Sequence, residues 1–407
     1  MIYKPLGQFV RLSQGLAINK STNHLVSANK NEEFCYPLLR IADMMENRFT
    51  KFISKEVNPT VVASQNDIIY TRTGQIGLVF RGYKGVVHNN SFIIKLINDE
   101  IDENYLYTLL QSNFVRTQAL KLAKNSVQPD LTHEMFKSIM IPIPENKIEQ
   151  IEISKSYNTI VKKIKTNNEI ISELESITKT IYDYWFLQFE FPNEDGKPYK
   201  SSGGKMVWNE KLKREIPEGW GIETLGDIIG KVSNSVKSDK TNGLPYTPMD
   251  ELPMRKMSFG SYKSDKEAKS SLLLYKKNQL LFGSMRAYFH RVCIAPFDGI
   301  TRTTTFVFEP KVNGSLGYSF ETLNLDSTVN YAVANSIGTQ QPYAVWESSM
   351  SSMKLPKVPL ELKLEYSSNI ESIIQKVIAN NLENQELASL RDFLLPMLMN
   401  GQVTFKD

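Results

Sequence analysis

Residues 167–176 read NNEIISELES, and residues 380–389 read NNLENQELAS. The paired asparagines, the Glu-Leu dipeptide and the final serine each recur at a step of 213 residues. Further out, Gln128 recurs as Gln341 at the same step, and NDIIY at 66–70 resembles NQLLF at 278–282 at a step of 212. Several weak matches in one order at a nearly constant offset predict that the chain is an internal duplication.

Each copy spans about 200 residues, whereas a solenoid repeat has roughly 20–50. We therefore interpret each copy as a whole globular domain followed by its own trailing segment. A Pro-x-Pro-like exit ends each globular part, at 141–144 in the first copy and at 355–359 in the second. The predicted division is a first domain at 1–143, a helix at 144–190, a linker at 191–215, a second domain at 216–358 and a second helix at 359–401.

The segments after the two exits have the apolar spacing of long helices. Residues 145–187 contain no Pro or Gly, and apolar residues recur there in steps of three and four. This pattern predicts a helix with a coiled-coil seam, which in the two copies is formed by Tyr157, Ile160, Ile164, Ile171, Leu174, Ile181 and Trp185 and by Ile370, Ile373, Val377, Leu387, Leu394 and Leu398. Asn167 and Asn380 occupy equivalent seam positions, where a polar residue fixes register.

The fold class predicted is α+β, with two similar globular domains that are each followed by a long helix. Strands are expected at 67–71, 76–80, 91–96, 280–283 and 303–308, and one helical stretch at 105–123. We expect the two long helices to pack on each other as an antiparallel intramolecular coiled coil. The alternative left open is that each helix packs only on its own domain.

Charge is distributed unevenly along the chain. The segments 1–143 and 201–357, which contain the two globular domains, carry net charges of +4 and +5, and the segments 144–200 and 358–407 carry −2 and −3. This distribution favours a polyanionic partner for the globular domains. Only Cys35 and Cys293 are present, and the N-terminal region lacks an apolar signal segment, so we expect a cytoplasmic protein with no membrane partner.

Motifs for catalysis are missing from the sequence. It has no GxxxxGK[ST] pattern for a nucleotide and no Gly-rich fingerprint for a dinucleotide or S-adenosylmethionine. The four histidines show no metal-ligand spacing. We expect a non-catalytic chain with no metal site and no cofactor of its own.

Two stretches at matching repeat positions carry side chains of the types that can read DNA. Arg pairs with guanine and Asn or Gln with adenine, while Lys, Ser and Thr contact phosphates. Loops that follow a strand end suit a groove-facing position. The candidate DNA-binding residues are Arg72, Gln75, Arg81, Lys84, Asn89, Asn90, Lys124 and Gln128 in the first copy, and Ser284, Arg286, Tyr288, His290, Arg291, Arg302, Gln340 and Gln341 in the second.

Taken together, these features resemble the specificity subunit of type I restriction-modification enzymes. The resemblance rests on Gln128-Pro129 with the exit IPIP and Glu149-Gln150, on IPEGW at 216–220, and on LRDFLLPMLMNG at 390–401. It implies two target-recognition domains that each read half of a bipartite, asymmetric site on double-stranded DNA, with the helices as a ruler. It also implies two methyltransferase subunits that use S-adenosylmethionine, and restriction subunits that use ATP and Mg²⁺.

The second copy departs from this pattern where its helix begins. It reads LELK at 360–363 and lacks the Glu-Gln pair, so the contacts at the start of that helix are expected to differ. Two other functions remain open at this point. One is a protein–protein adaptor that binds through its helices, and the other is an enzyme with an unrecognised nuclease site at 201–270.

Overall fold

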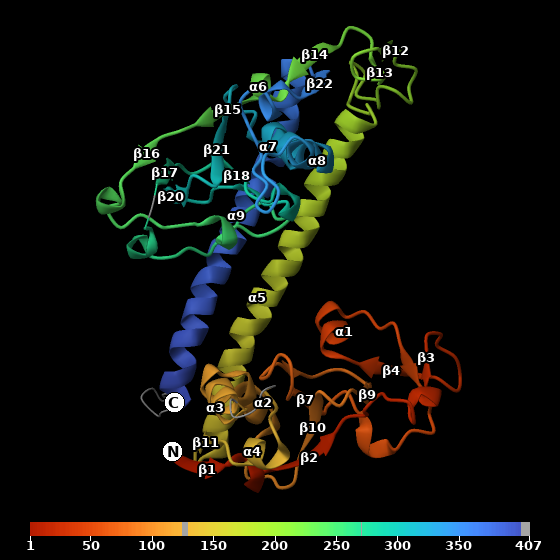
Figure 1. The fold of residues 1–407 in the computed structure, drawn as a ribbon, viewed down its shortest axis with the longest axis vertical. Helices are drawn as coiled ribbons and strands as arrows, with labels where there is room; N and C mark the ends of the chain where they lie inside the picture. The colour runs from red at the N-terminus through yellow and green to blue at the C-terminus, as the bar shows by residue number, and fades with distance from the viewer. Residues whose placement is uncertain (124–128, 270, 400–407) are drawn as a thin grey trace. The chain divides into compact units, whose positions relative to one another are not determined.

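The computed structural model describes residues 1–123, 129–269 and 271–399. The chain divides into two compact units, Met1–Lys162 with the segment from Ser389 onward, and Lys163–Ala388. Each unit therefore contains one globular domain and part of both long helices (Figure 1). The predicted boundaries of the folding domains remain a prediction, because the compact units divide the chain inside the helices.

The first globular domain is built on two sheets and a pair of helices. Its four-stranded sheet has the order β2-β10-β7-β8, and its five-stranded sheet has the order β3-β5-β4-β9-β6. Strand β1 pairs with β11 and closes the domain, so that the first strand lies beside the exit to the long helix. The bounds are β1 Ile2–Pro5, β2 Val10–Gln14, β3 Val26–Ser27, β4 Tyr36–Leu39, α1 Ile41–Glu46, β5 Phe52–Ile53, β6 Val62–Ala63, β7 Ile68–Thr71, β8 Val79–Phe80, β9 Gly85–Val87, β10 Ser91–Leu96, α2 Glu103–Gln111, α3 Asn113–Ala123, α4 His133–Lys137 and β11 Met140–Ile143.

The second globular domain repeats this plan. Its sheet β15-β21-β18-β19 has the order of β2-β10-β7-β8, its pair β14-β22 matches β1-β11, and its helix pair α7-α8 matches α2-α3. A three-stranded sheet, β16-β17-β20, forms its second lobe. The bounds are β14 Gly221–Thr224, α6 Leu225–Ile228, β15 Ile229–Val232, β16 Ser235–Val236, β17 Leu272–Tyr275, β18 Leu280–Gly283, β19 Val292–Ile294, β20 Gly299–Arg302, β21 Thr305–Pro310, α7 Leu316–Asn324, α8 Asp326–Ala334 and β22 Lys354–Lys357. The duplication inferred from the sequence is thus present in the fold.

The two long helices, α5 (Lys147–Tyr182) and α9 (Leu360–Met399), are antiparallel inside each unit. In the second unit Tyr366 Oη donates to the carbonyl oxygen of Thr178 at 2.9 Å, and Asn167 Nδ2 donates to Glu383 Oε2 at 2.8 Å. The residue numbers rise on one helix as they fall on the other, as antiparallel packing requires. The predicted pairing is confirmed.

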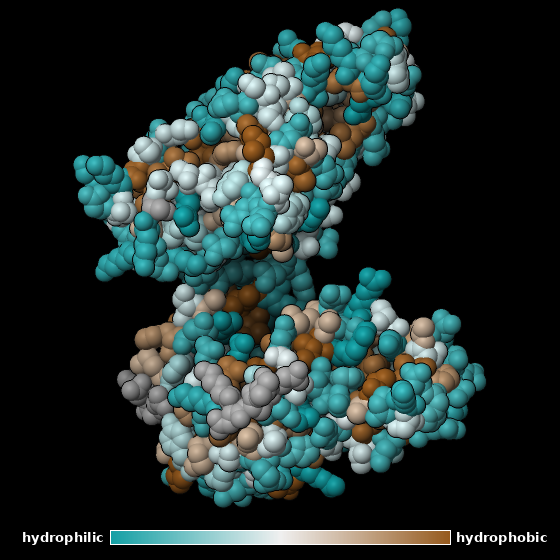
Figure 2. All heavy atoms as spheres, in the orientation of Figure 1, coloured by the Kyte–Doolittle hydropathy of each residue, from teal (hydrophilic) through white to brown (hydrophobic). Residues whose placement is uncertain are grey.

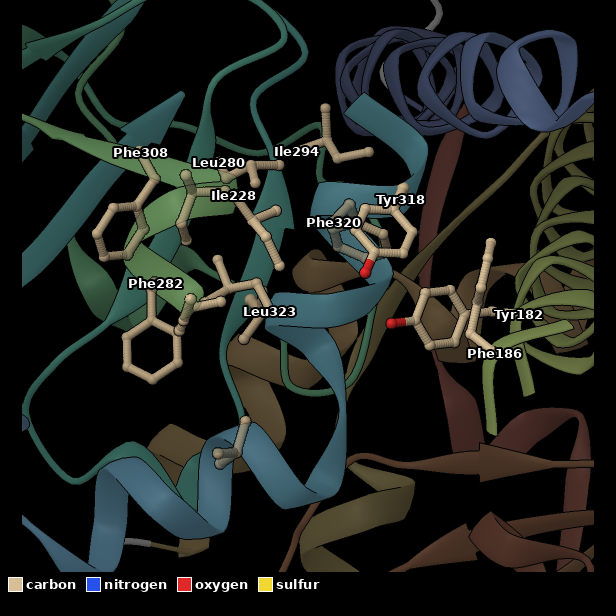
Figure 3. Close-up of a cluster of buried hydrophobic side chains, with 14 of the residues drawn as sticks. Tyr182, Phe186, Ile228, Leu280, Phe282, Ile294, Phe308, Tyr318, Phe320 and Leu323 are labelled. Carbon is tan, nitrogen blue, oxygen red and sulfur yellow. The ribbon is translucent and has the colours of Figure 1, made fainter. Parts of the chain in front are cut away.

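Both helices also pack on the globular domains. In the second unit Tyr182, at the end of α5, and Phe186, in the π-helical turn that follows it (Asp183–Leu187), join Tyr318 of α7 and the sheet residues Phe282 and Phe308 in one core (Figure 3). In the first unit the corresponding core includes side chains from the end of α9, namely Leu394 and Leu398. The alternative in which each helix packs only on its own domain is wrong, because each core contains a segment of the other repeat's helix.

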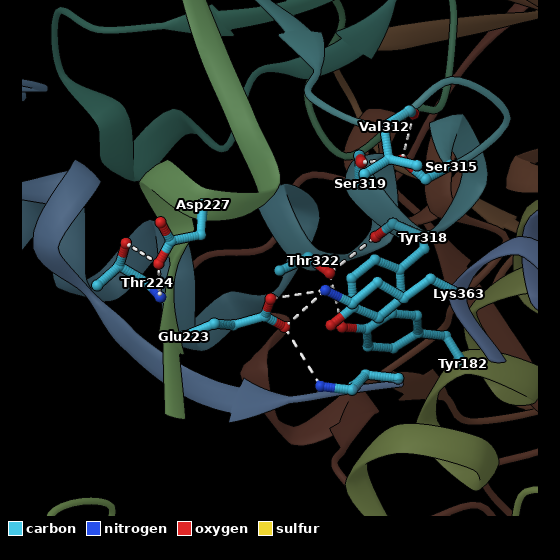
Figure 4. Close-up of polar contacts among 11 residues, drawn as sticks. Tyr182, Glu223, Thr224, Asp227, Val312, Ser315, Tyr318, Ser319, Thr322 and Lys363 are labelled. Carbon is cyan, nitrogen blue, oxygen red and sulfur yellow. Dashed lines mark hydrogen bonds and ion pairs between the residues drawn. The ribbon is translucent and has the colours of Figure 1, made fainter. Parts of the chain in front are cut away.

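The two helices begin with different contacts, as the departure at 360–363 predicts. In the first copy the buried Gln150 receives the amide of Asp102 at 2.7 Å and donates to two backbone carbonyl oxygens. At the same repeat position in the second copy, Lys363 forms an ion pair with Glu223 Oε2 at 2.6 Å; the Glu223 side chain is buried and that of Lys363 is 11% exposed (Figure 4). A neutral hydrogen-bonding residue is therefore replaced by a buried charge pair.

Three expectations about local structure need correction. The helical stretch at 105–123 divides at Ser112, whose hydroxyl accepts the amide of Val115 and so begins a new helix. The expected strand at 76–80 is short, because only 79–80 pair with β7. The predicted linker contains the hairpin strand β12 (Met206–Asn209), which pairs with β13 (Arg214–Pro217). No helix in the described residues is both long and apolar enough to cross a membrane.

The seam asparagines generate a first prediction. Asn167 of α5 donates to Glu383 and Asn384 of α9. The equivalent positions of α5, 213 residues before these two acceptors, are isoleucines and cannot accept a hydrogen bond from Asn380. Asn380 Nδ2 is buried with no partner among the described residues. We expect Asn167→Leu to lower the free energy of unfolding by about 1–3 kcal/mol and Asn380→Leu to leave it unchanged or raise it. Urea denaturation of both variants measures the difference. Equal losses in the two variants would contradict this account of the seam.

The ion pair at the start of α9 generates a second prediction. Lys363→Met leaves the Glu223 carboxylate buried without its cation, which should lower the free energy of unfolding by about 3–5 kcal/mol. The double variant Glu223→Gln with Lys363→Met removes both charges and should recover most of that loss. The comparison uses the same urea titration, and a double variant as unstable as the single one would show that charge burial is not the cause.

Candidate nucleic-acid interface

In the first domain, the loop after β7 contacts two other segments that contain or adjoin predicted DNA-binding residues. Thr73 forms an isolated antiparallel bridge with Asp130, and the amide of Arg72 donates to the carbonyl oxygen of Asn90 at 2.8 Å. The loop at 71–75, the turn at 88–91 and the segment at 129–131 therefore form one loop junction. The junction brings together Arg72, Asn89 and Asn90, which are far apart in the sequence.

The second domain has a loop junction of the same design. Met285 forms an isolated antiparallel bridge with Tyr343, and the amide of Ser284 donates to the carbonyl oxygen of Thr304 at 2.9 Å. The bridging residues correspond to Thr73 and Asp130 at steps of 212 and 213. The same backbone contact thus occurs twice in the chain, at the position where both copies carry their predicted DNA-binding residues.

The remaining candidate DNA-binding residues of the first domain differ in the exposure and in the intramolecular contacts of their side chains. Gln75 and Lys84 are exposed, and Asn89 and Asn90 are half-buried. Arg81 directly follows β8, and its guanidinium contacts two residues at the start of α2, Asn104 at 2.9 Å and Glu103 at 3.1 Å. Lys124 and Gln128 lie outside the described residues.

In the second domain, Tyr288, Arg302, Gln340 and Gln341 are exposed. Ser284 is buried and donates to the Thr304 carbonyl oxygen. The other candidates have intramolecular contacts or are partly buried. Arg286 is half-buried with its Nε enclosed, and Arg291 donates to the carbonyl oxygens of Asp250 and Leu252.

A cavity of about 530 Å³ lies at the second junction. Arg302 and Gln341, both predicted from the sequence, line it together with Met285 and Thr304. Sequence reasoning missed its aromatic side chains, Tyr246 and Tyr343, and the nearby Lys263. The prediction was based on Gln340 and Gln341, so it identified this segment of the chain but did not include Tyr343, two residues further on.

His290 lies in a different place from the other candidates. Its side chain is buried, with Nε2 2.9 Å from the Asn324 carbonyl oxygen and Nδ1 3.4 Å from Asp326 Oδ1. These residues line a second cavity of about 270 Å³ that also includes Glu321 and, from α5, Lys179. His290 is therefore placed at the packing of the second domain on α5, and the loop junction is formed without its side chain.

Glu321 is the group in this cavity with the largest change in acidity. Its side chain is almost completely buried, and burial raises the pKa of its carboxyl group to about 7, against a smaller lowering by a hydrogen bond from Thr178. Asp326 shows the opposite direction, since the Arg255 guanidinium at 2.9 Å lowers its pKa. Within the described residues, no cluster of His, Cys, Asp or Glu has the arrangement of a metal site.

The visible surface of both globular domains is mainly hydrophilic, with hydrophobic residues in small groups (Figure 2). The described geometry therefore offers exposed donors on paired loop junctions. Such an arrangement is suited to a class of protein that binds nucleic acid through two similar domains.

Comparison with known proteins agrees with this class. Residues 3–176 match the family described as "Type I restriction modification DNA specificity domain". The chain is 23% identical over 358 residues to the type I restriction enzyme MjaIX specificity subunit of Methanocaldococcus jannaschii. The alignment covers 84% of this chain and 78% of that protein. The MjaVIII specificity subunit of the same organism is 22% identical over 428 residues and covers 98% and 93%.

The fold has a solved counterpart. The crystal structure of a type I restriction-modification system S subunit from M. genitalium superposes with a TM-score of 0.61, at 16% identity, over 98% of this chain and 96% of that one. The family match lies in the first copy, and the second copy repeats its fold. Residues 3–176 thus match the DNA specificity domain of type I restriction-modification systems, and the relatives that align over most of this chain are specificity subunits of such systems.

Burial of Glu321 generates a prediction for stability against pH. Because the folded pKa is raised from 4.5 to about 7, the folded state binds the proton more tightly than the unfolded state between these values. This group therefore makes the protein less stable as pH rises from about 4.5 to 7, and its effect is constant above that range. Glu321→Gln should be more stable than wild type at pH 8 by up to about 3 kcal/mol, and the advantage should vanish near pH 4.

Urea denaturation of wild type and Glu321→Gln across this pH range measures the effect. The exposed Glu365 provides a control, and Glu365→Gln should follow the wild-type curve. A constant difference between Glu321→Gln and wild type at every pH would contradict the assignment.

Proposed function

We propose that this specificity subunit reads a bipartite, asymmetric site on double-stranded DNA, with one half of the site assigned to each domain. The observation that carries the proposal is the loop junction that occurs twice, bridged by Thr73 and Asp130 in one domain and by Met285 and Tyr343 in the other. The backbone contact is shared, but the side chains at the matched positions differ. Two domains with one scaffold and different side chains select two different half-sites.

The paired helices act in this proposal as a ruler that sets the distance between the half-sites. Support comes from the polar contacts of Asn167 with Glu383 and Asn384, which hold one register of α5 against α9. A slip of either helix would break both hydrogen bonds. The separation that the helices impose on the two domains would then change in steps of about 1.5 Å per residue.

We also propose the division of labour in the assembly. Two methyltransferase subunits that use S-adenosylmethionine bind this chain, and restriction subunits that use ATP and Mg²⁺ join them in the cytoplasm. This chain contributes recognition and no catalytic group. The proposal rests on the match of residues 3–176 to the type I restriction-modification DNA specificity domain, on the similarity to specificity subunits, and on a sequence without nucleotide-binding or S-adenosylmethionine-binding motifs.

The proposal predicts strongly salt-dependent binding of duplex DNA. Contacts with about 6–10 phosphates should reduce the affinity by about 10³–10⁵ between 50 and 200 mM salt. Fluorescence anisotropy of the purified full chain with a labelled duplex measures this slope. A slope near zero would support the adaptor function instead. Sequencing of methylated bases in the host genome, with and without this gene, tests the sequence selectivity directly.

A further inference from the structure

The two loop junctions share their backbone contact but differ in how their side chains are used. In the first domain, Arg72 closes the junction. Its guanidinium contacts Asp130 Oδ2 at 2.6 Å and the carbonyl oxygens of Leu131 and Asn89 at 3.3 Å each. The side chain is only 13% exposed and lies over the ring of Phe92. Its donors are therefore used inside the domain.

In the second domain, the matched positions cannot form this closure. Ser284 stands where the first domain has Arg72, and its hydroxyl donates to the carbonyl oxygen of Thr304 at 2.8 Å. Tyr343 stands where the first domain has Asp130 and is 39% exposed. The cation and the carboxylate that close the first junction are both replaced, and the cavity of about 530 Å³ lies at this position.

The groups in this cavity are suited to a base edge rather than to a phosphate. The exposed side chains of Arg302 and Gln341 offer donors and an amide acceptor. Lys263 pairs with Asp250 at 3.6 Å, whereas Glu267 also lines the cavity with no ion pair among the described residues and adds negative charge, which disfavours a phosphate. A base edge in the major groove presents donors and acceptors together, and Arg and Gln match the purines in this way.

The aromatic residues give the cavity fixed walls. Tyr246 is 6% exposed, and its backbone pairs with Lys263 and with Ile300 of β20. Tyr343 is held by its bridges to Met285 and Ile337. The donors of Arg302 and Gln341 thus project from a site whose backbone is anchored on both sides.

We propose that Arg302 and Gln341 determine the specificity of the second domain by reading purine edges in its half-site, and that Arg72 of the first domain is a positioning residue that holds its loop. This inference rests on the proposed function and adds the residues and the base class of one half-site. The two domains therefore use the same junction in different ways.

The test is selection of bound duplexes from a random-sequence pool by the full chain, followed by sequencing. Arg302→Ala and Gln341→Ala should each reduce the preference for one purine in one half-site by about 5- to 150-fold, the range of a bidentate base contact, and leave the other half-site unchanged. Arg302→Lys keeps the charge but loses the forked geometry, so it should not restore the preference. Lys277→Ala removes an exposed charge outside the cavity and should select the wild-type motif.

Arg72→Ala completes the comparison. It should lower the thermal unfolding midpoint, whereas Arg302→Ala should not. Identical motifs for wild type, Arg302→Ala and Gln341→Ala would overturn the inference, as would recovery of the preference by Arg302→Lys, which would indicate a phosphate contact. If wild type selects no motif at all, the proposed function fails, and this inference fails with it.

Discussion

The structure depends on the antiparallel contact of α5 with α9, because each globular core is completed by the helix of the other repeat. Tyr182 and Phe186 of the first repeat pack among Tyr318 and Tyr366 in the second unit, while Leu394 and Leu398 of the second repeat pack in the core of the first unit. Apolar burial of this kind is the main favourable term in folding. The helix pair is thus part of both hydrophobic cores as well as the connection between the domains.

Much of this fold could be predicted from the sequence, because it follows from periodicity. The step of 213 residues gave the duplication, and the spacing of apolar residues gave two long helices. The seam at Tyr157, Ile171 and Val377 is buried as expected, whereas Ile373 is only half-buried and its neighbour Ile374 is buried among residues of the second core. A heptad pattern reports the face of a helix that is buried, but it does not distinguish a partner helix from a domain surface.

The candidate site was less predictable, because the type of a side chain does not show which partner it contacts. Arg72 and Arg302 both follow the rule that places a DNA-reading arginine near a strand end, yet one is held by Asp130 and the other is exposed. That partner lies 58 positions away from Arg72, and only folding brings it close. The same limit applies to the two seam asparagines, whose identical positions have unequal partners.

The shared hydrophobic cores also restrict how a globular domain can be exchanged during evolution. A new first domain introduced by recombination within the gene would have to keep apolar side chains, such as those of Leu109 and Val115, that share a core with Tyr157 of α5 and Leu398 of α9. Exchange is therefore confined to sequences that keep these side chains, while the loops at the junction are free to diverge. New sequence preferences can arise in this protein without redesign of its framework, provided that the surface under Leu394 and Leu398 is retained.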